Sequence, residues 1–461
     1  MTKHIDSKIE KCKKHLFALK SVIGKKWGPN PHLMRWAYIG IVRPKLTYAC
    51  HLWYHKMTET TKKKLLKLNR LACLSIAPVH KSTPTLGMEI IYDILPLDLY
   101  VEQVATKIHS RIQNQIHPCW SGIGKNPKDL GHIYIGKKII SSMGLQNLPS
   151  EQIKKRNWTR KFEILNFLDH KNDASENANT YYCYTDGSKM KSQAGFGYQI
   201  RVKHKERNKN STYLGSIATV FQAEVMAISM VAKDLQRVQG QRIIIRSDSQ
   251  AAVLALQSSY IDSSIVEECL SALNRLSEKN KVILQWIKAH VGHAGNEAAD
   301  LYAKLGSETK VSGPEPFLPV PQSFIDTKIS DKIKQKWTKR WSKEKSCRQT
   351  KLWFETISTK FKAFLAKGSR IEVGRLVQFI TGHCNLRRHQ NLINEEINPN
   401  CRLCNQKLET PWHLVTECPG LLNARENLFQ GQILHSIEWT PQLLLRFCKV
   451  PKLWTMLEGH E

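Results

Sequence analysis

Two strand-like runs that each end on an aspartate restrict the fold of this chain more than any other feature. Residues 181–185 read YYCYT and precede Asp186, and residues 242–247 read RIIIRS and precede Asp248. The second run is almost continuously apolar, which is typical of a strand buried on both faces of a sheet. Because α/β folds build sites at the carboxyl ends of such strands, we expect both aspartates to lie in a functional site.

Two further carboxylates lie in predicted helices. Glu224 is followed at helical spacing by Ile228, Val231 and Leu235, so it shares the apolar stripe of an amphipathic helix. An unpaired carboxylate that faces a core is costly, and Glu224 therefore needs a cation, a partner or a proton. Asp300 falls early in another predicted helix, where a carboxylate that complements the helix dipole is the simpler interpretation.

Four carboxylates that converge from two strands and two helices would repel one another unless metal ions lie between them. Oxygen ligands suit Mg²⁺ or Mn²⁺, and two such ions about 4 Å apart can bind the attacking and leaving oxygens of a phosphodiester. His290 follows the strand-like run at residues 282–287. A lone histidine is more often structural, but beside these carboxylates it is a candidate proton shuttle.

Residues 181–308 resemble a type 1 ribonuclease H domain. The motifs that carry the resemblance are YTDGS at 184–188, AE at 223–224, SDSQAA at 247–252, and WIKAH at 286–290, followed by Gly292, Asn296, Glu297 and Asp300. The resemblance implies that two magnesium or manganese ions are held by Asp186, Glu224, Asp248 and Asp300, with His290 as the mobile histidine. It also implies an endoribonuclease that cuts the RNA strand of RNA–DNA hybrids and leaves 5′-phosphomonoesters.

Substrate contacts are predicted with less support. Gln250 and Asn296 could reach the minor groove of the hybrid, where 2′-hydroxyls distinguish the RNA strand. Gly187 and Ser188 complete the set, because a glycine beside Asp186 lets a phosphate or a second backbone come close. Some family members grip the hybrid with a basic helical insertion, whereas residues 265–279 form one predicted helix containing three glutamates. The grip on nucleic acid must therefore come from elsewhere in the chain.

The predicted fold of residues 181–308 is α/β, with a ribonuclease H-like mixed sheet of five strands flanked by helices. Three strands come first, the second and third at residues 195–202 and 211–217, and Gly195 and Gly197 favour close approach of another backbone. Helix, strand, two helices, a strand at 282–288 and a last helix follow.

The composition indicates a polyanionic partner. The formal net charge is +31, of which residues 1–180 carry +17, residues 181–310 only +5, and residues 311–461 +9. A soluble basic surface rarely needs so large an excess, so we expect the regions outside the predicted nuclease to bind RNA or DNA.

The first 115 residues are predicted to be helical and to resemble the region after the palm of non-LTR retrotransposon reverse transcriptases. The similarity lies in LNRLACL at residues 68–74, in TPT at 83–85 and in LPL at 95–97. The paired aspartates of the polymerase are not found, so no polymerase activity is expected. We expect the chain to be the C-terminal part of a longer element-encoded protein.

Two segments are predicted to connect the domains. Residues 116–180 are poorly patterned and end in a polar linker at 171–179, and residues 309–322 are rich in proline. Residues 323–461 are then predicted to form a basic helical region. There, Trp337 and Trp341 lie four residues apart, which fits base stacking among lysines and fits an apolar helical stripe equally well.

A second cluster with metal-ligand spacing lies within residues 401–418. Its pattern is C-x2-C-x8-H-x4-C, formed by Cys401, Cys404, His413 and Cys418. Three thiolates and one imidazole leave no open position, so the predicted Zn²⁺ is structural. The segment resembles the C-terminal zinc-binding segment of non-LTR retrotransposon proteins, with His383 as an alternative ligand. Both nucleic-acid binding and simple stabilisation of the fold are consistent with such a module.

The sequence predicts an intracellular protein in a reducing compartment, either nucleus or cytoplasm. Most of the 12 cysteines are scattered singly, the N-terminus lacks an apolar signal core, and residues 32–54 are too charged to span a membrane. The main functional prediction is a retroelement-derived ribonuclease H. The alternatives are a non-catalytic nucleic-acid-binding remnant of a retrotransposon protein and an interaction protein that zinc orders.

Overall fold

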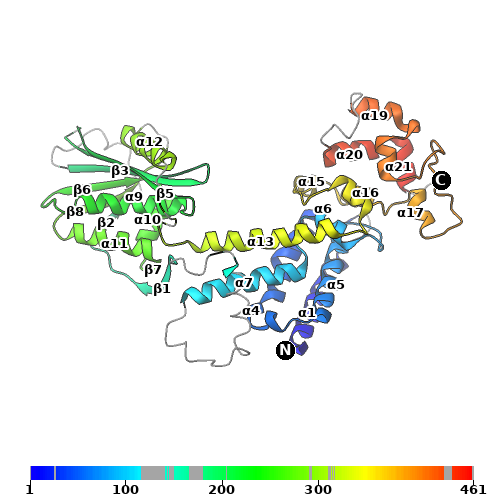
Figure 1. Cartoon of the computed structure of the whole chain (residues 1–461), viewed down its shortest axis with the longest axis horizontal. Helices are drawn as coiled ribbons and strands as arrows, with labels where there is room; N and C mark the ends of the chain where they lie inside the picture. The colour runs from blue at the N-terminus through cyan, green and yellow to red at the C-terminus, as the bar shows by residue number, and fades with distance from the viewer. Residues whose placement is uncertain are drawn as a thin grey trace. The chain divides into compact units, whose positions relative to one another are not determined.

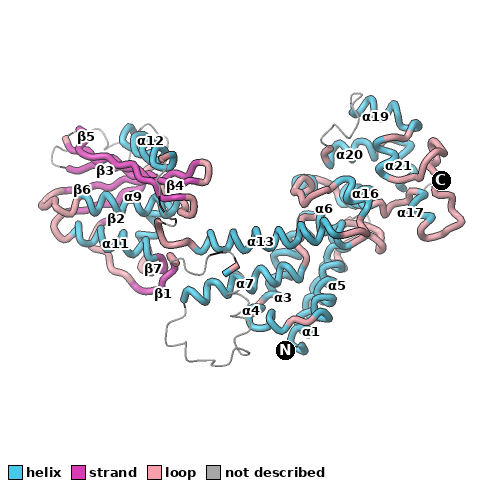
Figure 2. Tube along the Cα trace, in the orientation of Figure 1, coloured by secondary structure: helices cyan, strands magenta, loops and turns pink. Residues whose placement is uncertain are grey.

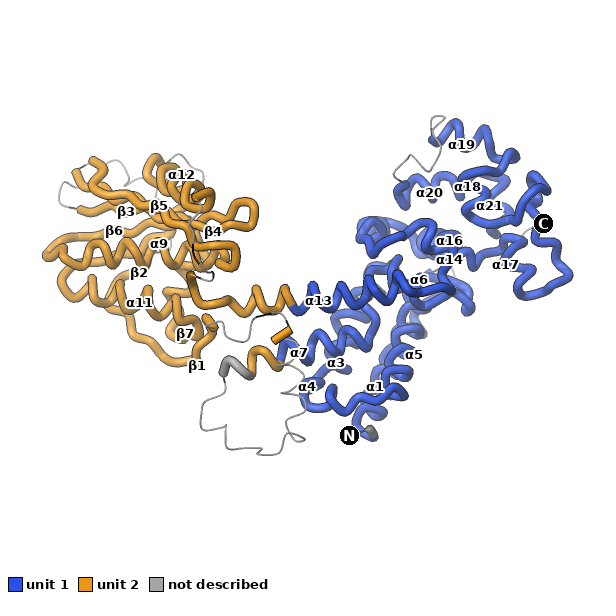
Figure 3. The backbone as a smooth tube through the Cα atoms, viewed as in Figure 1, with its two compact units in different colours: residues 1–108, 329–461 blue, residues 109–328 orange. Residues whose placement is uncertain are grey.

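The structure is a computed structural model (Figure 1). The residues that it describes are 2–24, 27–115, 141–142, 144, 150–165, 180–203, 205–289, 293–309, 313, 315, 317–429 and 439–458. The chain forms two compact units (Figure 3), one of residues 1–108 with 329–461 and one of residues 109–328. Within the described ranges, we find no helix with the length and apolarity that crossing a membrane requires.

A six-stranded mixed sheet forms the centre of the second unit, in the order β2-β8-β6-β3-β4-β5. β3 runs antiparallel to β4, and β4 antiparallel to β5, whereas β3, β6, β8 and β2 are parallel. The strands are β2 (Glu163–Leu165), β3 (Thr180–Met190), β4 (Gln193–Val202), β5 (Lys205–Gly215), β6 (Arg242–Ser247) and β8 (Lys281–Trp286). The predicted α/β class is confirmed, with the apolar run at 242–247 as a central strand.

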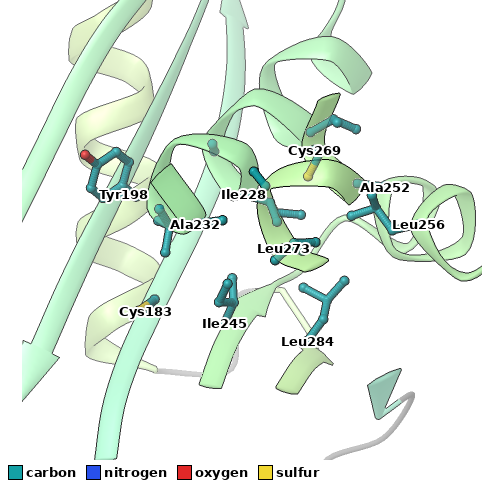
Figure 4. Packing of buried hydrophobic residues seen from close by; sticks show 14 of the residues in the cluster. Cys183, Tyr198, Ile228, Ala232, Ile245, Ala252, Leu256, Cys269, Leu273 and Leu284 are labelled. Carbon is teal, nitrogen blue, oxygen red and sulfur yellow. The ribbon is translucent and has the colours of Figure 1, made fainter. Parts of the chain in front are cut away.

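Helices cover both faces of this sheet (Figure 2). The helices are α9 (Val220–Asp234), α10 (Gln250–Gln257), α11 (Ser264–Ser277) and α12 (Ala294–Glu308). The larger core lies between the sheet and α9 and α11, where Ile228 and Leu273 pack near Ile245 and Leu284 (Figure 4). α12 packs on β3, β4 and β5, and its Ala299 joins a smaller apolar cluster with Tyr184. This arrangement is the ribonuclease H-like fold.

The glycine at position 197 allows α12 to contact the sheet closely. A Cβ atom there would lie 2.3 Å from the backbone nitrogen of Ala303. No side chain can be accommodated at that distance, so the predicted close approach of a second backbone is confirmed.

The five strands predicted within residues 181–308 are confirmed, and a sixth strand of the same sheet comes from the stretch predicted to lack a pattern. β2 pairs in parallel with β8 at the edge of the sheet. A further strand, β1 (Gln152–Asn157), pairs antiparallel with β7 (Tyr260–Ser263), and neither was predicted. β1 reads QIKKRN and is mostly exposed, and β2 has three residues, so neither carries the apolar alternation that indicates a strand.

The predicted connecting segments are described in part. Residues 171–179 lie outside the described residues. In the proline-rich segment, the Glu315 carboxylate accepts a hydrogen bond from the Ser216 backbone nitrogen at 3.0 Å, and the Pro319 carbonyl accepts one from Gln222 Nε2 at 2.9 Å. These described residues therefore pack on the second unit.

The first unit is helical in both of its parts. The N-terminal helices are α1 (Thr2–Ser21), α2 (Pro31–Ala37), α3 (Arg43–Thr47), α4 (Cys50–Trp53), α5 (Glu59–Ile76), α6 (Thr85–Ile91) and the start of α7 (Leu97–Gln115), with the π-helical turn Tyr38–Val42 between α2 and α3. The C-terminal helices are the end of α13 (Gln322–Lys343), α14 (Arg348–Trp353), α15 (Lys362–Lys367), α16 (Arg370–Thr381), α17 (Arg387–Asn391), α18 (Pro411–Thr416), α19 (Leu422–Phe429), α20 (Pro441–Cys448) and α21 (Pro451–Glu458).

A carboxyl group is buried among the N-terminal helices. Glu89 on α6 is fully buried, and its Oε1 accepts a hydrogen bond from Asn69 on α5. Burial raises the pKa of Glu89 to about 8, so the group carries a proton at neutral pH in the folded protein.

The two tryptophans of α13 belong to the core. Trp337 is 5% exposed and Trp341 is 1% exposed, and Trp341 Nε1 donates to the Phe354 carbonyl at 2.9 Å. Rings buried to this extent have no free face for a base, so the apolar stripe is the correct one of the two interpretations.

Candidate active site

Three of the four predicted carboxylates meet at one edge of the sheet. β3 and β6 are parallel, and Thr185 pairs with Ser247 at the end of their ladder, so Asp186 and Asp248 follow paired residues. Glu224 reaches them from α9. One oxygen from each carboxylate lies within 4.8 Å of the other two. Two strand ends and one helix therefore bring together residues that are up to 62 positions apart.

The position of Glu224 depends on the start of α9 and on Gly187. Thr219 and Gln222 form a capping box at the start of the helix, where each side chain accepts a hydrogen bond from the other's backbone nitrogen. A Cβ atom at position 187 would lie 2.5 Å from the Glu224 nitrogen. Gly187 therefore allows α9 to contact β3 directly beside Asp186.

Asp186 and Glu224 lie in an environment that disfavours negative charge. Asp186 is 8% exposed and Glu224 is 5% exposed. Burial, and then the charges of Asp248 and Asp300, raise the pKa of Asp186 to about 7. Burial, followed by the charges of Asp186 and Asp248, raises the pKa of Glu224 well above its usual value. A divalent cation would reverse both effects, because it favours the ionised carboxylates.

An unpartnered buried oxygen indicates that the cluster can accept such a cation. Glu224 Oε2 is buried and has no hydrogen-bond partner among the described residues. Buried polar atoms are nearly always paired, with an ion or with a partner. The set of donors contains oxygen alone, which is the ligand chemistry that Mg²⁺ and Mn²⁺ prefer. The residues present therefore fit the predicted metal.

Asp300 lies near this cluster but outside the group of three. Its side chain on α12 is 31% exposed, and its Oδ2 forms an ion pair with Lys304 Nζ at 2.6 Å. Lys304 lies one helical turn further along α12. Its charge contributes to the raised pKa of Asp186, so the two carboxylates are close enough to interact. His290 lies outside the described residues.

The predicted substrate contacts have different environments. Asn296 is 6% exposed, and its Nδ2 donates to Asp248 Oδ2 at 3.0 Å. Gly187 is buried against α9, Ser188 is partly exposed, and Gln250 is exposed. Their contacts with a hybrid stay predictions, but the bond from Asn296 means that this amide orients a carboxylate of the cluster.

One buried group near the cluster was not predicted. Arg246 on β6 is 6% exposed, and it donates to the Tyr184 hydroxyl at 2.8 Å and to Gln285 Oε1 at 3.1 Å. Alternate residues of a strand share a face, so Tyr184 and Asp186 lie on the same face of β3. The sequence could have indicated this buried group, because Arg246 is a charged residue inside the apolar run at 242–247.

A second metal-compatible cluster lies in the first unit. The ligand atoms of Cys401, Cys404, His413 and Cys418 all lie within 4.8 Å of one another. Cys401 Sγ is 3.7 Å from Cys418 Sγ, and Cys404 Sγ is 3.3 Å from His413 Nε2. The alternative ligand His383 does not belong to this group, and its Nδ1 contacts the Thr381 carbonyl at 3.0 Å.

Local structure explains how His413 reaches the cysteines. Thr410 caps α18, and its hydroxyl accepts a hydrogen bond from the His413 backbone nitrogen at 3.1 Å. Glu409 is fully buried and accepts hydrogen bonds from the Arg402 side chain and backbone. These contacts hold the turn that carries the first cysteine pair against the helix that carries the histidine.

Comparison with known proteins agrees with the geometry of the second unit. The RNase H family model matches residues 178–308. Ribonuclease H of Shewanella baltica is 23% identical over 146 residues, which cover 29% of this chain and 92% of that protein. Ribonuclease HI of Helicobacter pylori is 27% identical over 135 residues, covering 28% of this chain and 93% of that protein.

A solved structure, RNase H1 from the halophilic archaeon Halobacterium salinarum, aligns with 28% of this chain and 96% of its own, at 20% identity and a TM-score of 0.24. The family match, the curated relatives and the mixed sheet with carboxylates at one edge all concern the same part of the chain. Residues 178–308 are therefore an RNase H domain.

Proposed function

We propose that this domain hydrolyses the RNA strand of RNA–DNA hybrids and leaves 5′-phosphomonoesters. The observation that supports the proposal best is the cluster of Asp186, Glu224 and Asp248, whose oxygens lie within 4.8 Å of one another. The unpartnered Glu224 Oε2 adds to it. The names of the relatives, ribonuclease H and ribonuclease HI, indicate the same activity.

The four carboxylates Asp186, Glu224, Asp248 and Asp300 would hold two Mg²⁺ or Mn²⁺ ions. When bound, these ions supply Lewis-acid activation of a water and of the phosphodiester. Asn296 keeps the Asp248 carboxylate in one orientation through its hydrogen bond. Asp300 is paired with Lys304, so it would exchange that partner on binding. His290 would carry a proton or assist release of the product.

The test uses the full chain, magnesium and an RNA–DNA hybrid labelled on the RNA strand. We expect cleavage by the wild type, loss of cleavage with retained binding in Asp186→Asn, and normal cleavage in Asp262→Asn. Asp262 lies on the exposed side of β7, so its substitution is a matched change of charge outside the cluster. Binding without cleavage by the wild type would contradict the proposal and support the non-catalytic remnant.

One observation favours that remnant as a second candidate. α11 ends at Ser277 and β8 begins at Lys281, so no basic helix lies between them. A hybrid must then be bound by residues outside this interval. If those residues bind it too weakly at the carboxylate cluster, the chain would bind nucleic acid at other sites and cleave no hybrid.

We infer that Cys401, Cys404, His413 and Cys418 bind one structural Zn²⁺. Support comes from the convergence of all four ligand atoms and from the absence of a free position in a Cys₃His set. We also propose that residues 1–115 and 323–461 derive from a non-LTR retrotransposon protein, on the resemblance of residues 68–74, 83–85, 95–97 and 401–418. A polymerase-coding sequence just upstream of the codon for Met1 would support this origin.

A further inference from the structure

The N-terminal helices carry an unusual concentration of positive charge. Residues 1–56 contain twelve lysines and arginines against two acidic residues, Asp6 and Glu10. Both acids are already paired, Asp6 with Lys64 at 2.7 Å and Glu10 with Lys13 at 2.6 Å. The remaining cations of this segment therefore cannot be neutralised by its own carboxylates.

Several of these cations line one groove between α1 and α3. The groove has a volume of about 720 Å³ and is lined by His4, Ser7, Lys8, Lys11, Cys12, His15, Pro44, Lys45 and Tyr48. No carboxylate lines it. Among the described residues, no acidic side chain lies within ion-pair distance of Lys8, Lys11 or Lys45. The groove therefore has the electrostatic character of an anion-binding site.

Neutral contacts hold the groove cations in position. Lys8 Nζ donates to the Tyr48 carbonyl at 3.3 Å. Lys45 Nζ contacts His15 Nε2 at 2.7 Å, and His15 Nδ1 contacts the Lys11 carbonyl at 2.7 Å. An ammonium can only donate, so Lys45 Nζ donates to the His15 ring, while the Lys11 carbonyl can only accept. Lys45 is thus oriented without losing its charge to a carboxylate.

An aromatic ring lies beside these cations. Tyr48 is 74% exposed, which is exceptional for a large aromatic side chain. Lys8 Nζ lies 4.7 Å from the centre of the Tyr48 ring, so one cation contacts the ring while the rest of the side chain meets solvent. Phosphate-binding lysines next to an exposed ring are what single-stranded nucleic acids require, because their bases are free to stack.

We propose that the groove formed by Lys8, Lys11, Lys45 and Tyr48 is a binding site for single-stranded nucleic acid. The lysines contact successive phosphates, and the Tyr48 ring stacks on a base. The site belongs to the first unit, while the RNase H carboxylates belong to the second, so it binds a strand independently of hydrolysis.

The test measures binding of a fluorescent dT oligonucleotide of about 12 nucleotides to the full chain, as a function of salt. This DNA contains no RNA strand, so cleavage does not interfere. The groove variant Lys8→Gln/Lys11→Gln/Lys45→Gln should bind at least about tenfold more weakly near 0.1 M salt, and its log–log salt slope should fall by about 2, since about 0.7 counterions are released per phosphate contact.

The matched control is Lys13→Gln/Lys62→Gln/Lys64→Gln. It removes the same charge, from α1 and α5, but these lysines are paired with Glu10, Glu59 and Asp6 outside the groove. We expect its affinity to stay within about twofold of the wild type. Equal losses in both variants would overturn the proposal, because binding would then follow net charge alone.

Two further variants separate stacking from charge and from misfolding. Tyr48→Ala should weaken binding about tenfold with an unchanged salt slope, while Tyr48→Phe should bind normally. Because Lys8 contacts the backbone of α3 and Tyr48, the double variant Lys11→Gln/Lys45→Gln repeats the test without that contact being lost. Normal binding by this double variant and by Tyr48→Ala would refute the site.

A membrane surface is the competing partner for a basic groove. Flotation with phosphatidylcholine vesicles that contain about 30% phosphatidylserine tests it. Vesicle binding that the groove variant loses, together with unchanged oligonucleotide binding, would replace our proposal. Hybrid cleavage is scored separately on the same proteins. A wild type that cleaves no hybrid but binds the oligonucleotide through the groove would contradict only the proposed nuclease.

Discussion

Asn296 on α12 donates a hydrogen bond from Nδ2 to Oδ2 of Asp248 at 3.0 Å. The bond links the last helix of the RNase H domain to the end of β6. Asp248 is also held through its backbone, because its carbonyl accepts from Trp286 Nε1 at 3.0 Å. Residues from α12 and β8 therefore fix Asp248, and the bond from Asn296 orients its carboxylate.

We expect Asn296→Ala to lower hybrid cleavage by about 10- to 100-fold, with a higher magnesium concentration at half-maximal rate, because partners that orient a ligand tune metal binding to this degree. Cleavage rates measured across a magnesium titration provide the test. Gln239→Ala is the control, since Gln239 is exposed in the segment between α9 and β6. If Asn296→Ala weakened hybrid binding but left the magnesium dependence unchanged, the residue would contact substrate instead.

We expect Gly187→Ala to separate Asp186 from Glu224. A methyl group 2.5 Å from the Glu224 nitrogen would force α9 away from β3, and such overpacking costs about 1–3 kcal/mol of stability. Cleavage should fall by about 100-fold, because catalysis depends on sub-ångström placement.

Cleavage assays and thermal unfolding of the same preparation measure both effects. Gly313→Ala serves as the control, because its added methyl would meet Phe317 at an ordinary 3.5 Å. A Gly187→Ala protein with full activity would show that the contact between β3 and α9 does not set the geometry of the cluster.

The buried Glu89 makes the stability of the first unit depend on pH. Its pKa is about 8 in the folded protein because of burial, and 4.5 is its ordinary value. Since the folded pKa is the higher one, the contribution is fully present below about pH 4.5 and is lost as the pH rises through 8. We therefore expect Glu89→Gln, which stays neutral, to raise the unfolding temperature at pH 8.5 and to change it little at pH 4.5.

Thermal unfolding across this range, followed by tryptophan fluorescence, provides the measurement. Glu59→Gln is the control, because Glu59 is exposed and pairs with Lys62 on the surface. A pH profile of Glu89→Gln that runs parallel to that of the wild type would contradict the assignment of the titration to Glu89.

We expect the C-terminal cysteine cluster to hold one equivalent of zinc. Cys404→Ser should lose most of it and expose the surrounding segment to protease, because structural zinc contributes about 10–16 kcal/mol of binding free energy. Elemental analysis and limited proteolysis measure the two effects. His383→Gln should retain zinc, since His383 lies outside the cluster; loss of zinc in that variant would reassign the fourth ligand.

The parts of the fold that could be predicted are those with a strong apolar pattern. The apolar run at residues 242–247 predicts a buried strand, which the structure contains. The apolar residues that follow Glu224 at helical spacing predict that its carboxylate faces the core, and it is buried in the structure. β1 could not be found, because its lysine-rich sequence pairs through the backbone with β7 and buries little. Strands of this kind are specified by neighbours that the local sequence does not reveal.

Side-chain partners were harder to predict than elements. The four-residue spacing of Trp337 and Trp341 is consistent both with packing in a core and with stacking on bases. Only the burial of the two side chains distinguishes these interpretations. The spacing of Asn296 indicates a position beside the cluster, but which group it bonds depends on where α12 meets β6. Hydrogen bonds between distant elements depend on how the whole chain packs, and no local stretch of the sequence specifies that packing by itself.

Thr185 and Ser247 are ladder partners in two adjacent parallel strands. The distance between the aspartates that follow them is therefore set by the spacing of paired strands, which is the same in every parallel sheet. Loops, substrate-binding insertions and additional domains can therefore differ in sequence without changing the distance between these two aspartates. Glu224 and Asp300 are instead carried by α9 and α12, so control of the proposed activity would act on these two helices or on access to the site.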